Sequence, residues 1–289
     1  MRVLHKQSGF NLVELVIVIV ITGILAGILA TFIARPVQGF IDLSRRATLV
    51  YSAESAMRRM QRDIRRALPN SLRVNAANNA IEMINTVEGA RYRSAPPPGQ
   101  QARRLTFNNP DSDFDVLGNL ASIGVTGLRV AIYNIGAVDL AGTPVRGSNA
   151  YALADAVTGT NVVTPAGQAI TISENGNEDH INIGGGGFQF THDSPNDRAY
   201  LVDTGISYIC SAGQLMRYDN YDFTNSTQPV PPVGADSALM TDNIGSCTFT
   251  YEAGTVQRAG LMTLDLTISD PNSGEQVRLL HQVHVDNVP

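Results

Sequence analysis

The hydrophobic and polar positions near the start of the chain form two successive patterns. Leu15–Ala34 is a run of 20 residues without a formally charged side chain. As a helix, this run is about 30 Å long, which is the thickness of the hydrocarbon core of a bilayer. After Pro36, apolar residues recur three or four positions apart, as on one face of an amphipathic helix. These apolar positions are Phe40, Leu43, Ala47, Val50, Ala53, Met57, Met60, Ile64 and Leu68.

Together the two patterns predict one long helix from about Phe10 to Leu68. Residues 10–34 would form its transmembrane half and residues 35–68 its amphipathic half. Pro36 lies between the halves and predicts a kink or local melting where the helix leaves the bilayer, because proline removes one helical hydrogen bond.

The transmembrane half also carries a stripe of small residues. Gly23, Gly27, Ala30 and Ala34 follow one another at intervals of four, three and four positions. Such spacing places them on one face, where a second helix backbone could approach closely, as helix packing in lipid requires. The alternative is chance, since glycine is common in membrane helices.

The rest of the chain, residues 70–289, consists of short alternating or β-branched segments that predict strands. The clearest pair is Gly260–Ser269 and Glu275–Val285, which a turn-rich loop separates and which predicts a terminal antiparallel hairpin. The other expected strands are Ala80–Val87, Arg103–Phe107, Gly127–Asn134, Ala169–Ser173, His180–Ile183, Gly187–Thr191, Gly205–Cys210 and Cys247–Glu252. The sequence therefore predicts an α+β protein, with the long N-terminal helix packed on one β-rich antiparallel globular domain.

Charge is distributed unevenly along the 289 residues, of which only 16% are charged. Residues 1–73 hold 11 basic and 4 acidic side chains, whereas residues 74–289 hold 10 basic and 22 acidic ones. The acidic body argues against general nucleic-acid binding. Arg2 and Lys6 precede the apolar run, so the positive-inside tendency leaves the N-terminus in the cytoplasm and carries the body across the membrane.

A cleaved secretory signal is the simplest explanation of a basic start followed by an apolar run. Two features argue against it. Glu14 lies at the start of the apolar run, where a carboxylate is costly and usually has a partner. In addition, the helical pattern continues far beyond the place where a signal peptide would be cut.

The string Gly9-Phe10-Asn11-Leu12-Val13-Glu14 directly before the apolar helix resembles the processing signal of the type IV prepilin and pseudopilin family. The resemblance implies that residues 1–9 are a leader, which a prepilin peptidase removes after Gly9. It also implies methylation of the new amine at Phe10. Glu14 would then meet the terminal amine of a neighbouring subunit as the helices of pilins pack together.

Several further stretches resemble minor pilins of the mannose-sensitive haemagglutinin (MSHA) type of pilus. The similarity covers most of the chain except about residues 75–200. The matching stretches are Arg35-Pro36-Val37, Arg58-Arg59-Met60-x-Arg62-Asp63, Ala67-Leu68-Pro69-Asn70-Ser71, Ser207-Tyr208-Ile209-Cys210, Leu215-x-Arg217-Tyr218 and His284-Val285-Asp286-Asn287-Val288-Pro289.

The two cysteines of the chain, Cys210 and Cys247, both lie in the translocated body. An oxidising compartment favours a disulfide between them, and two buried thiols are the alternative. The bridge would close a loop that contains the aromatic-rich Arg217–Phe223 and the proline-rich Gln228–Gly234. We expect this loop to be an exposed excursion.

Candidate metal and catalytic residues are few. Asp111, Asp113 and Asp115 resemble the start of a calcium loop, but Val116 stands where the turn glycine belongs, so a solvated acidic loop is preferred. His281 and His284 lie in an expected strand, where a spacing of three places them on opposite faces. The chain contains no nucleophile-elbow, zincin or Walker pattern. We therefore expect neither an enzyme nor a bound cofactor.

The functional expectation from the resemblance is a minor pilin that acts in pilus biogenesis, at the tip or in an initiation complex. Its implied partners are other major and minor pilins, the prepilin peptidase, the inner-membrane assembly platform and membrane lipid, with no nucleic acid. Its implied location is the inner membrane, with one pass and a periplasmic body, and then the pilus on the cell surface. Three alternatives stay open: a minor pseudopilin of a type II secretion system, a tip adhesin that uses the Cys210–Cys247 loop, and a membrane-anchored hydrolase. The missing nucleophile motifs argue against the hydrolase.

Overall fold

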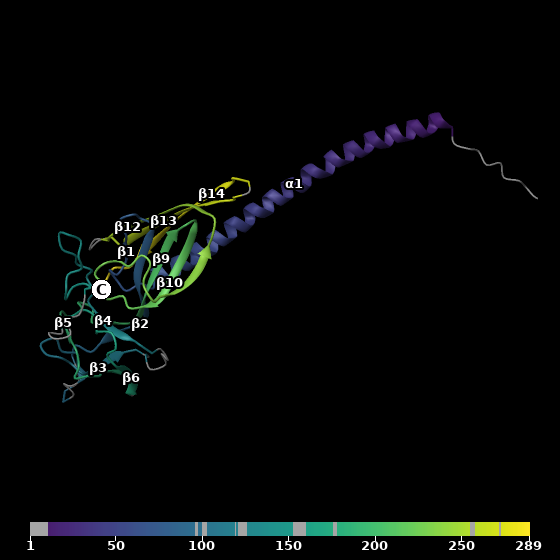
Figure 1. The fold of residues 1–289 in the computed structure, drawn as a ribbon. Helices are drawn as coiled ribbons and strands as arrows, with labels where there is room; N and C mark the ends of the chain where they lie inside the picture. Colours follow the sequence, from purple (N-terminus) through teal and green to yellow (C-terminus); the bar gives the residue numbers. More distant parts are fainter. Residues whose placement is uncertain are drawn as a thin grey trace, which may run out of the picture. The chain divides into compact units, whose positions relative to one another are not determined.

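The computed structural model describes residues 11–95, 98–99, 103–118, 120, 126–152, 160–175, 178–254, 258–271 and 273–289. The chain divides into two compact units, Met1–Tyr51 and Ser52–Pro289. The first unit consists, in its described part, almost entirely of helix, most of whose described side chains are exposed. The second, called the globular unit below, contains the end of that helix and all the strands (Figure 1).

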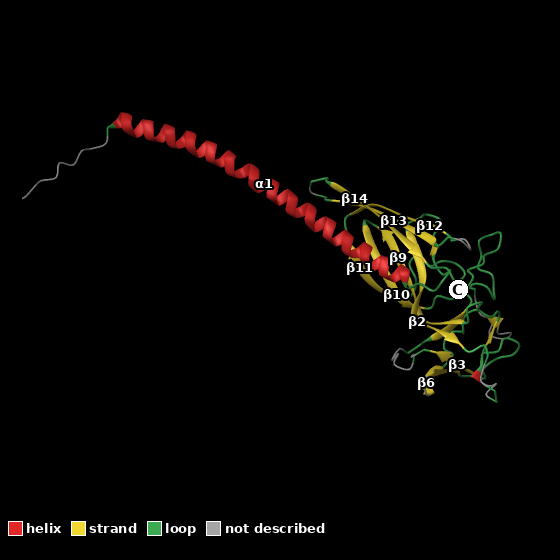
Figure 2. Ribbon diagram, turned by 180° about the vertical axis from the view of Figure 1, so that it is seen from behind, coloured by secondary structure: helices red, strands yellow, loops and turns green. Residues whose placement is uncertain are grey.

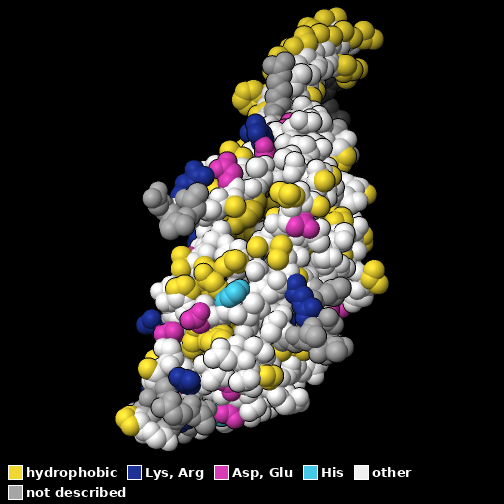
Figure 3. All heavy atoms as spheres, turned by 90° about the vertical axis from the view of Figure 1, so that its left-hand side faces the viewer, with side chains coloured by type: hydrophobic (Ala, Val, Ile, Leu, Met, Phe, Trp, Pro, Cys, Tyr) yellow, Lys and Arg dark blue, Asp and Glu magenta, His cyan; other side chains and the backbone are white. Residues whose placement is uncertain are grey.

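The helix α1 extends from Leu12 to Arg65, close to the expected limits. It passes through Pro36 without interruption, so the expected local melting is absent. An 18-residue stretch of α1 is apolar and long enough to cross a membrane. Hydrophobic side chains lie exposed along this part of the helix, as Figure 3 shows for one face. After Arg65 the chain leaves the helix because the amide of Leu68 pairs with the carbonyl of Ile84 in a strand.

The strands of the described residues form one large sheet, one small sheet and a short parallel pair. The large sheet has the order β11-β10-β9-β2-β3-β7-β6, with β1 paired to β2 and β4 paired to β9. All its pairs are antiparallel. Its strands are β1 (Arg73–Val74), β2 (Ala80–Tyr92), β3 (Asp113–Leu117), β4 (Arg129–Ile132), β6 (Ile170–Asn175), β7 (Glu178–Ile183), β9 (Arg198–Ser211), β10 (Gln214–Tyr221) and β11 (Asp236–Thr241).

The small sheet has the order β12-β13-β14 and is also antiparallel. Its strands are β12 (Ile244–Glu252), β13 (Gly260–Ser269) and β14 (Gln276–Val285). The expected terminal hairpin is therefore confirmed within one residue. The parallel pair joins β5 (Thr160–Asn161) to β8 (Gln189–Phe190).

Two expectations about strands are wrong, and a third is wrong in part. Arg103–Phe107 contains no strand, whereas the expected acidic loop around Asp113 is strand β3. The segment between the two cysteines is only in part an exposed excursion. It forms β10 and β11 at one margin of the large sheet, whereas Val230 and Val233 between these strands are 43% and 98% exposed. Tyr221 and Phe223 from this segment are 8% and 1% exposed and belong to the core, whereas Tyr218 is half-buried.

The last turns of α1 form the centre of the main hydrophobic core. Met57, Met60 and Ile64 are fully buried, and they share one cluster with side chains of both sheets. The large sheet contributes residues such as Met83 and Tyr208, and the small sheet contributes residues such as Phe249, Leu264 and Val283. Figure 2 shows these last turns beside β9, β10 and β11. The amphipathic stripe of the sequence is thus explained by burial between two sheets.

Candidate processing and assembly site

The described N-terminus of the helix has a defined cap. Asn11 precedes α1, and its side-chain Oδ1 accepts a hydrogen bond of 3.4 Å from the amide of Val13. Its carbonyl accepts the amide of Leu15 at 3.1 Å. Asparagine is favoured here because its side chain satisfies an amide that the first helical turn leaves unpaired. Gly9 and Phe10 lie just before this point, outside the described residues.

Glu14 is exposed in the first turn of α1. A carboxylate is favoured at this end because the helix dipole is positive there. Glu14 is the only formally charged residue between Asn11 and Ala34. Glu14 therefore places one carboxylate near the N-terminal end of an otherwise apolar helical segment. A positively charged group of another chain could reach it there.

The expected small-residue stripe is exposed where the structure describes it. Gly23, Gly27 and Ala30 face solvent, and a Cβ atom added at either glycine would meet nothing within 4 Å. For Ala34 the structure describes only the backbone, which is helical. In the single chain this face of the helix is open to a second helix. Whether another subunit packs against it stays a prediction.

At the other end of α1, hydrogen bonds of Asp63 connect the helix to the large sheet. Its Oδ2 accepts hydrogen bonds from the hydroxyl of Tyr208 at 2.7 Å and from Nε of Arg217 at 2.9 Å. Asp63 is only 8% exposed, so these donors replace the water it loses. Burial and the nearby Asp63 carboxylate raise the pKa of Tyr208, which keeps this hydroxyl protonated as a donor. The contact fixes the register of the helix on β9 and β10.

A second buried carboxylate, Glu82, lies in β2. It pairs with Arg73 at 2.6 Å and accepts the hydroxyl of Tyr221 at 3.0 Å. The Glu82 side chain is fully buried, and burial raises its pKa although Arg73 opposes the shift. One signal in the sequence marks this site: Glu82 is the single charged residue within the apolar string Ala80-Ile81-Glu82-Met83-Ile84. It is absent from the residues predicted above.

The C-terminal tail is hydrogen-bonded to Asn70, which follows the end of α1 at Arg65. The Asn70 side chain donates hydrogen bonds to the carbonyls of Asn134 at 2.9 Å and Asn287 at 3.1 Å. The Asn70 amide also donates to Oδ1 of Asn287 at 3.3 Å. Together with the Asp63 contacts, this brings five of the stretches that resemble MSHA-type minor pilins to one place. They meet around the last turns of the helix.

The expected disulfide is present between Cys210 and Cys247, with an S–S distance of 2.04 Å. Cys210 lies near the end of β9 in the large sheet, and Cys247 lies in β12 of the small sheet. The bridge therefore ties together the two sheets that enclose the helix.

The aspartates of the candidate calcium loop contact groups of the protein itself. The amide of Asp113 donates to Oδ1 of Asp111 at 3.3 Å, and the Asp113 carboxylate lies 3.9 Å from Nε2 of His180. Asp115 is fully buried in β3, where it pairs with Arg103 and, at 2.7 Å, with Nδ1 of His180. Asp111 accepts the amide of Thr106 at 2.7 Å. The preferred interpretation as a solvated acidic loop is therefore wrong for Asp115. The described residues contain no group of three or more His, Cys, Asp or Glu side chains arranged to hold a metal ion.

Two arginines and one glutamate lie in the same region of the sheet as Asp115. Arg93 and Arg103 both pair with Glu178. The Arg93 hydrogen bond holds the pKa of Glu178 below its usual value. Together these arginines balance the carboxylates of the neighbouring strands, which gives the cluster a structural role.

The two histidines of β14 lie on opposite faces, as expected. His281 faces the helix, and its Nδ1 lies 2.7 Å from Nε2 of Gln61 in α1. His284 is exposed on the other face.

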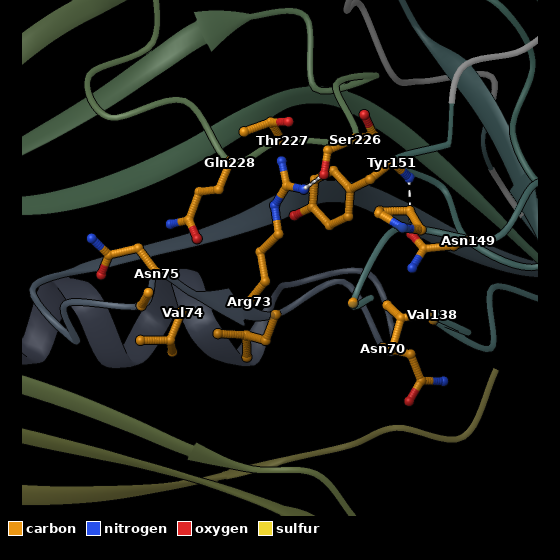
Figure 4. Close-up of a pocket in the computed structure, with 15 residues that line it drawn as sticks. Asn70, Arg73, Val74, Asn75, Val138, Asn149, Tyr151, Ser226, Thr227 and Gln228 are labelled. Atoms are coloured by element: carbon orange, nitrogen blue, oxygen red, sulfur yellow. Dashed lines mark hydrogen bonds between the residues drawn. The ribbon is translucent and has the colours of Figure 1, made fainter. Parts of the chain in front are cut away.

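A polar cavity of about 380 Å³ lies beside β1 (Figure 4). The guanidinium of Arg73 lies 3.7 Å from the centre of the Tyr151 ring. Arg73 also donates to the carbonyl of Ser226 at 3.0 Å, and the Tyr151 hydroxyl donates to the carbonyl of Ser71 at 2.6 Å. Gln228 donates to the carbonyl of Ala80 at 3.3 Å. These polar groups bind the chain's own backbone, so they hold loops together.

The N-terminal part of the chain matches a known protein family. Residues 4–30 match the family described as the prokaryotic N-terminal methylation motif. The match includes Gly9, Phe10, Glu14 and most of the apolar run, and it supports a type IV pilin-like protein. Such proteins are structural subunits that a prepilin peptidase processes and that assemble with other pilins. No curated protein and no solved structure matches the chain significantly.

Proposed function

We propose that this chain is a minor pilin of a type IV pilus of the MSHA type, most similar to the MSHA biogenesis protein MshO. It would act in pilus biogenesis, at the tip or in the initiation complex, without enzymatic activity or a cofactor. The observation that carries the proposal is the methylation motif in register with α1. The convergence of the MshO-like stretches around Asp63 and Asn70 supports the subfamily.

The proposed processing explains why a carboxylate occupies the apolar segment. Cleavage after Gly9 removes Arg2 and Lys6 and leaves a positive amine at Phe10, which methylation keeps positive. That amine and the carboxylate of Glu14 are each costly in hydrocarbon, but they neutralise each other when they meet. A subunit that provides both groups therefore gains most by packing its helix against another subunit, in one axial register.

The proposed route begins in the inner membrane. Residues 10–34 would span the bilayer with the N-terminus in the cytoplasm and the globular unit in the periplasm. The helix would then leave the lipid for the helical bundle of the pilus. The prepilin peptidase, the assembly platform and other major and minor pilins are its proposed partners, and the Gly23–Ala34 stripe is a proposed packing face.

A minor pseudopilin of a type II secretion system shares the N-terminal motif and the apolar helix, so it is the alternative that these observations support next best. The tip-adhesin alternative loses its main argument. The Cys210–Cys247 segment forms β10 and β11, and two of its three aromatic residues, Tyr221 and Phe223, are buried, whereas Tyr218 is half-buried.

Fibre assembly in cells that express only a mutated copy tests the proposal. We expect Glu14→Ala to leave a processed but unassembled protein in the membrane, and Gly9→Trp to leave an unprocessed precursor. Glu54→Ala is the matched control, because Glu54 is an acidic residue of the same helix but outside the apolar run. Normal piliation and normal incorporation of either the Glu14 or the Gly9 variant would refute the proposed mechanism.

A further inference from the structure

Strand β14 is a long edge strand whose second edge is unpaired. It pairs with β13 over Gln276–Val285 without a bulge, and no other strand of the described residues pairs with it. Figure 1 shows β14 at the outer margin of the small sheet. Natural proteins usually protect such edges with proline, lysine, bulges or a covering segment. β14 has no proline, lysine or bulge.

The backbone groups on the open edge can be assigned from the neighbouring hydrogen bonds. The amide of Asp270 donates to the carbonyl of Glu275, whereas the amide of Ser269 points to the other side and donates to Asn243. Amides and carbonyls alternate in direction along an antiparallel strand. The residues whose amide and carbonyl groups face the open edge are therefore Gln276, Arg278, Leu280, Gln282 and His284.

The helix beside this edge presents a basic flank. Gln61 contacts His281 of β14 and so marks where the strand crosses α1. At 3.6 residues per turn, Arg65 and Arg58 lie about 40° and 60° from Gln61 around the helix, on the side away from the core residue Met57. Arg62 lies about 40° beyond Arg58.

The positive charge of this flank is only partly neutralised by ion pairs with other described residues. Arg58, Arg62 and Arg65 are all exposed. Arg58 pairs with Glu54, but Arg62 and Arg65 make no ion pair with another described residue. A strand added to β14 would extend the small sheet over this flank. Because side chains alternate between the faces of a strand, every second residue of the added strand would face the arginines.

We propose that the open edge of β14 and the Arg58, Arg62 and Arg65 flank form one docking surface for an extended acidic segment of a partner protein. Main-chain hydrogen bonds to β14 provide the affinity, as in other strand-addition complexes. Carboxylates at alternate positions of the partner provide the specificity by pairing with the flank. This surface belongs to the globular unit alone, so the proposal does not depend on the processing motif.

A synthetic peptide as long as β14, in which glutamate alternates with valine, is the probe for this surface. It is added to the full mature chain in detergent micelles. We expect it to bind, and to slow hydrogen exchange at the open-edge amides of Gln276, Arg278, Leu280, Gln282 and His284. A peptide with lysine in place of glutamate is expected to bind much more weakly. Absence of binding, equal binding of both peptides, or protection elsewhere would overturn the proposal.

Matched variants separate the two parts of the surface. Gln282→Pro removes an amide from the open edge without removing a bond to β13, and is expected to weaken peptide binding about tenfold. Gln282→Ala keeps that amide and is expected to bind normally. Arg62→Ala with Arg65→Ala is expected to weaken binding about threefold, whereas Arg258→Ala, an exposed arginine at the end of the sheet, has no effect.

Hydrogen exchange of the unmutated chain tests the surface even if Gln282→Pro does not fold. Unchanged binding in the folded proline variant or in the double arginine variant would contradict the proposal. Concentration-dependent protection of the same amides without peptide would also overturn it, because the occupant would then be a second copy of this chain.

Discussion

At the residue scale, two buried carboxylates hold the globular unit together and each has an arginine and a tyrosine as partners. Asp63 connects α1 to β9 and β10, and Glu82 connects β2 to the Arg73 side chain. Such groups add little stability when intact, since burial removes their hydration. They matter because loss of one partner leaves the others buried and unsatisfied.

The substitution Asp63→Ala tests the role of the buried carboxylate that joins α1 to the large sheet. It leaves Arg217 and the Tyr208 hydroxyl without their shared acceptor, and we expect it to lower the free energy of unfolding by about 3 kcal/mol. Urea unfolding of the full chain in detergent measures the change. Glu54→Ala, which removes an acidic residue from an exposed pair on the same helix, is expected to change it by less than about 0.5 kcal/mol. Equal effects of the two substitutions would contradict the assigned role of Asp63.

Glu82 predicts a pH dependence with a definite sign. Burial raises its pKa in the folded protein above the ordinary value of 4.5, so the folded state binds the proton more tightly than the unfolded state. Its contribution to stability is therefore complete below pH 4.5 and is lost as the pH rises through the folded-state pKa. We expect the difference in unfolding free energy between the natural chain and Glu82→Gln to fall over this range. Parallel pH profiles would show that the pKa is not raised.

At the scale of elements, the Cys210–Cys247 bridge joins the two sheets that enclose the end of α1. It closes a loop of 37 residues. We expect replacement of both cysteines by serine to lower the free energy of unfolding by about 3 kcal/mol, because the unfolded chain gains freedom. A reductant should shift the unfolding curve of the natural chain similarly and leave that of the double variant unchanged. A reductant effect on the double variant would mean that the bridge is not the cause.

Elements with a strong local pattern could be predicted from the sequence, and elements defined by distant partners could not. The helix and the Gly260–Ser269 strand follow from apolar periodicity, and their limits agree with the structure within a few residues. The structure differs from the expected acidic loop at β3, because Asp113-Phe114-Asp115-Val116 alternates as a strand does but also resembles a metal loop. The pairing of Asp63 with Arg217 spans 154 residues, and no local signal reveals it.

The same distinction holds for the candidate site. The processing motif is contiguous, so the sequence alone indicated it, and the family match over residues 4–30 agrees. The junction around Asp63 and Asn70 is assembled from five separate stretches. Their resemblance to minor pilins could be noticed in the sequence, but their contact could be seen only in the structure.

At the scale of the whole molecule, the two parts of the helix α1 suit two different environments. Its first part is apolar, exposed and preceded by the methylation motif, which suits a membrane and then a bundle of similar helices. Its last turns are buried between two sheets and held by Asp63. A pull on the helix would therefore be transmitted to both sheets.

Mass spectrometry of the N-terminal peptide of the mature protein tests the central claim most directly. The account predicts a chain that begins at Phe10 and carries one methyl group on its terminal amine, in cells that contain a prepilin peptidase. In cells that lack the peptidase, the same protein should retain residues 1–9. A mature protein that still begins at Met1, or that is cut after the apolar run, would contradict the account.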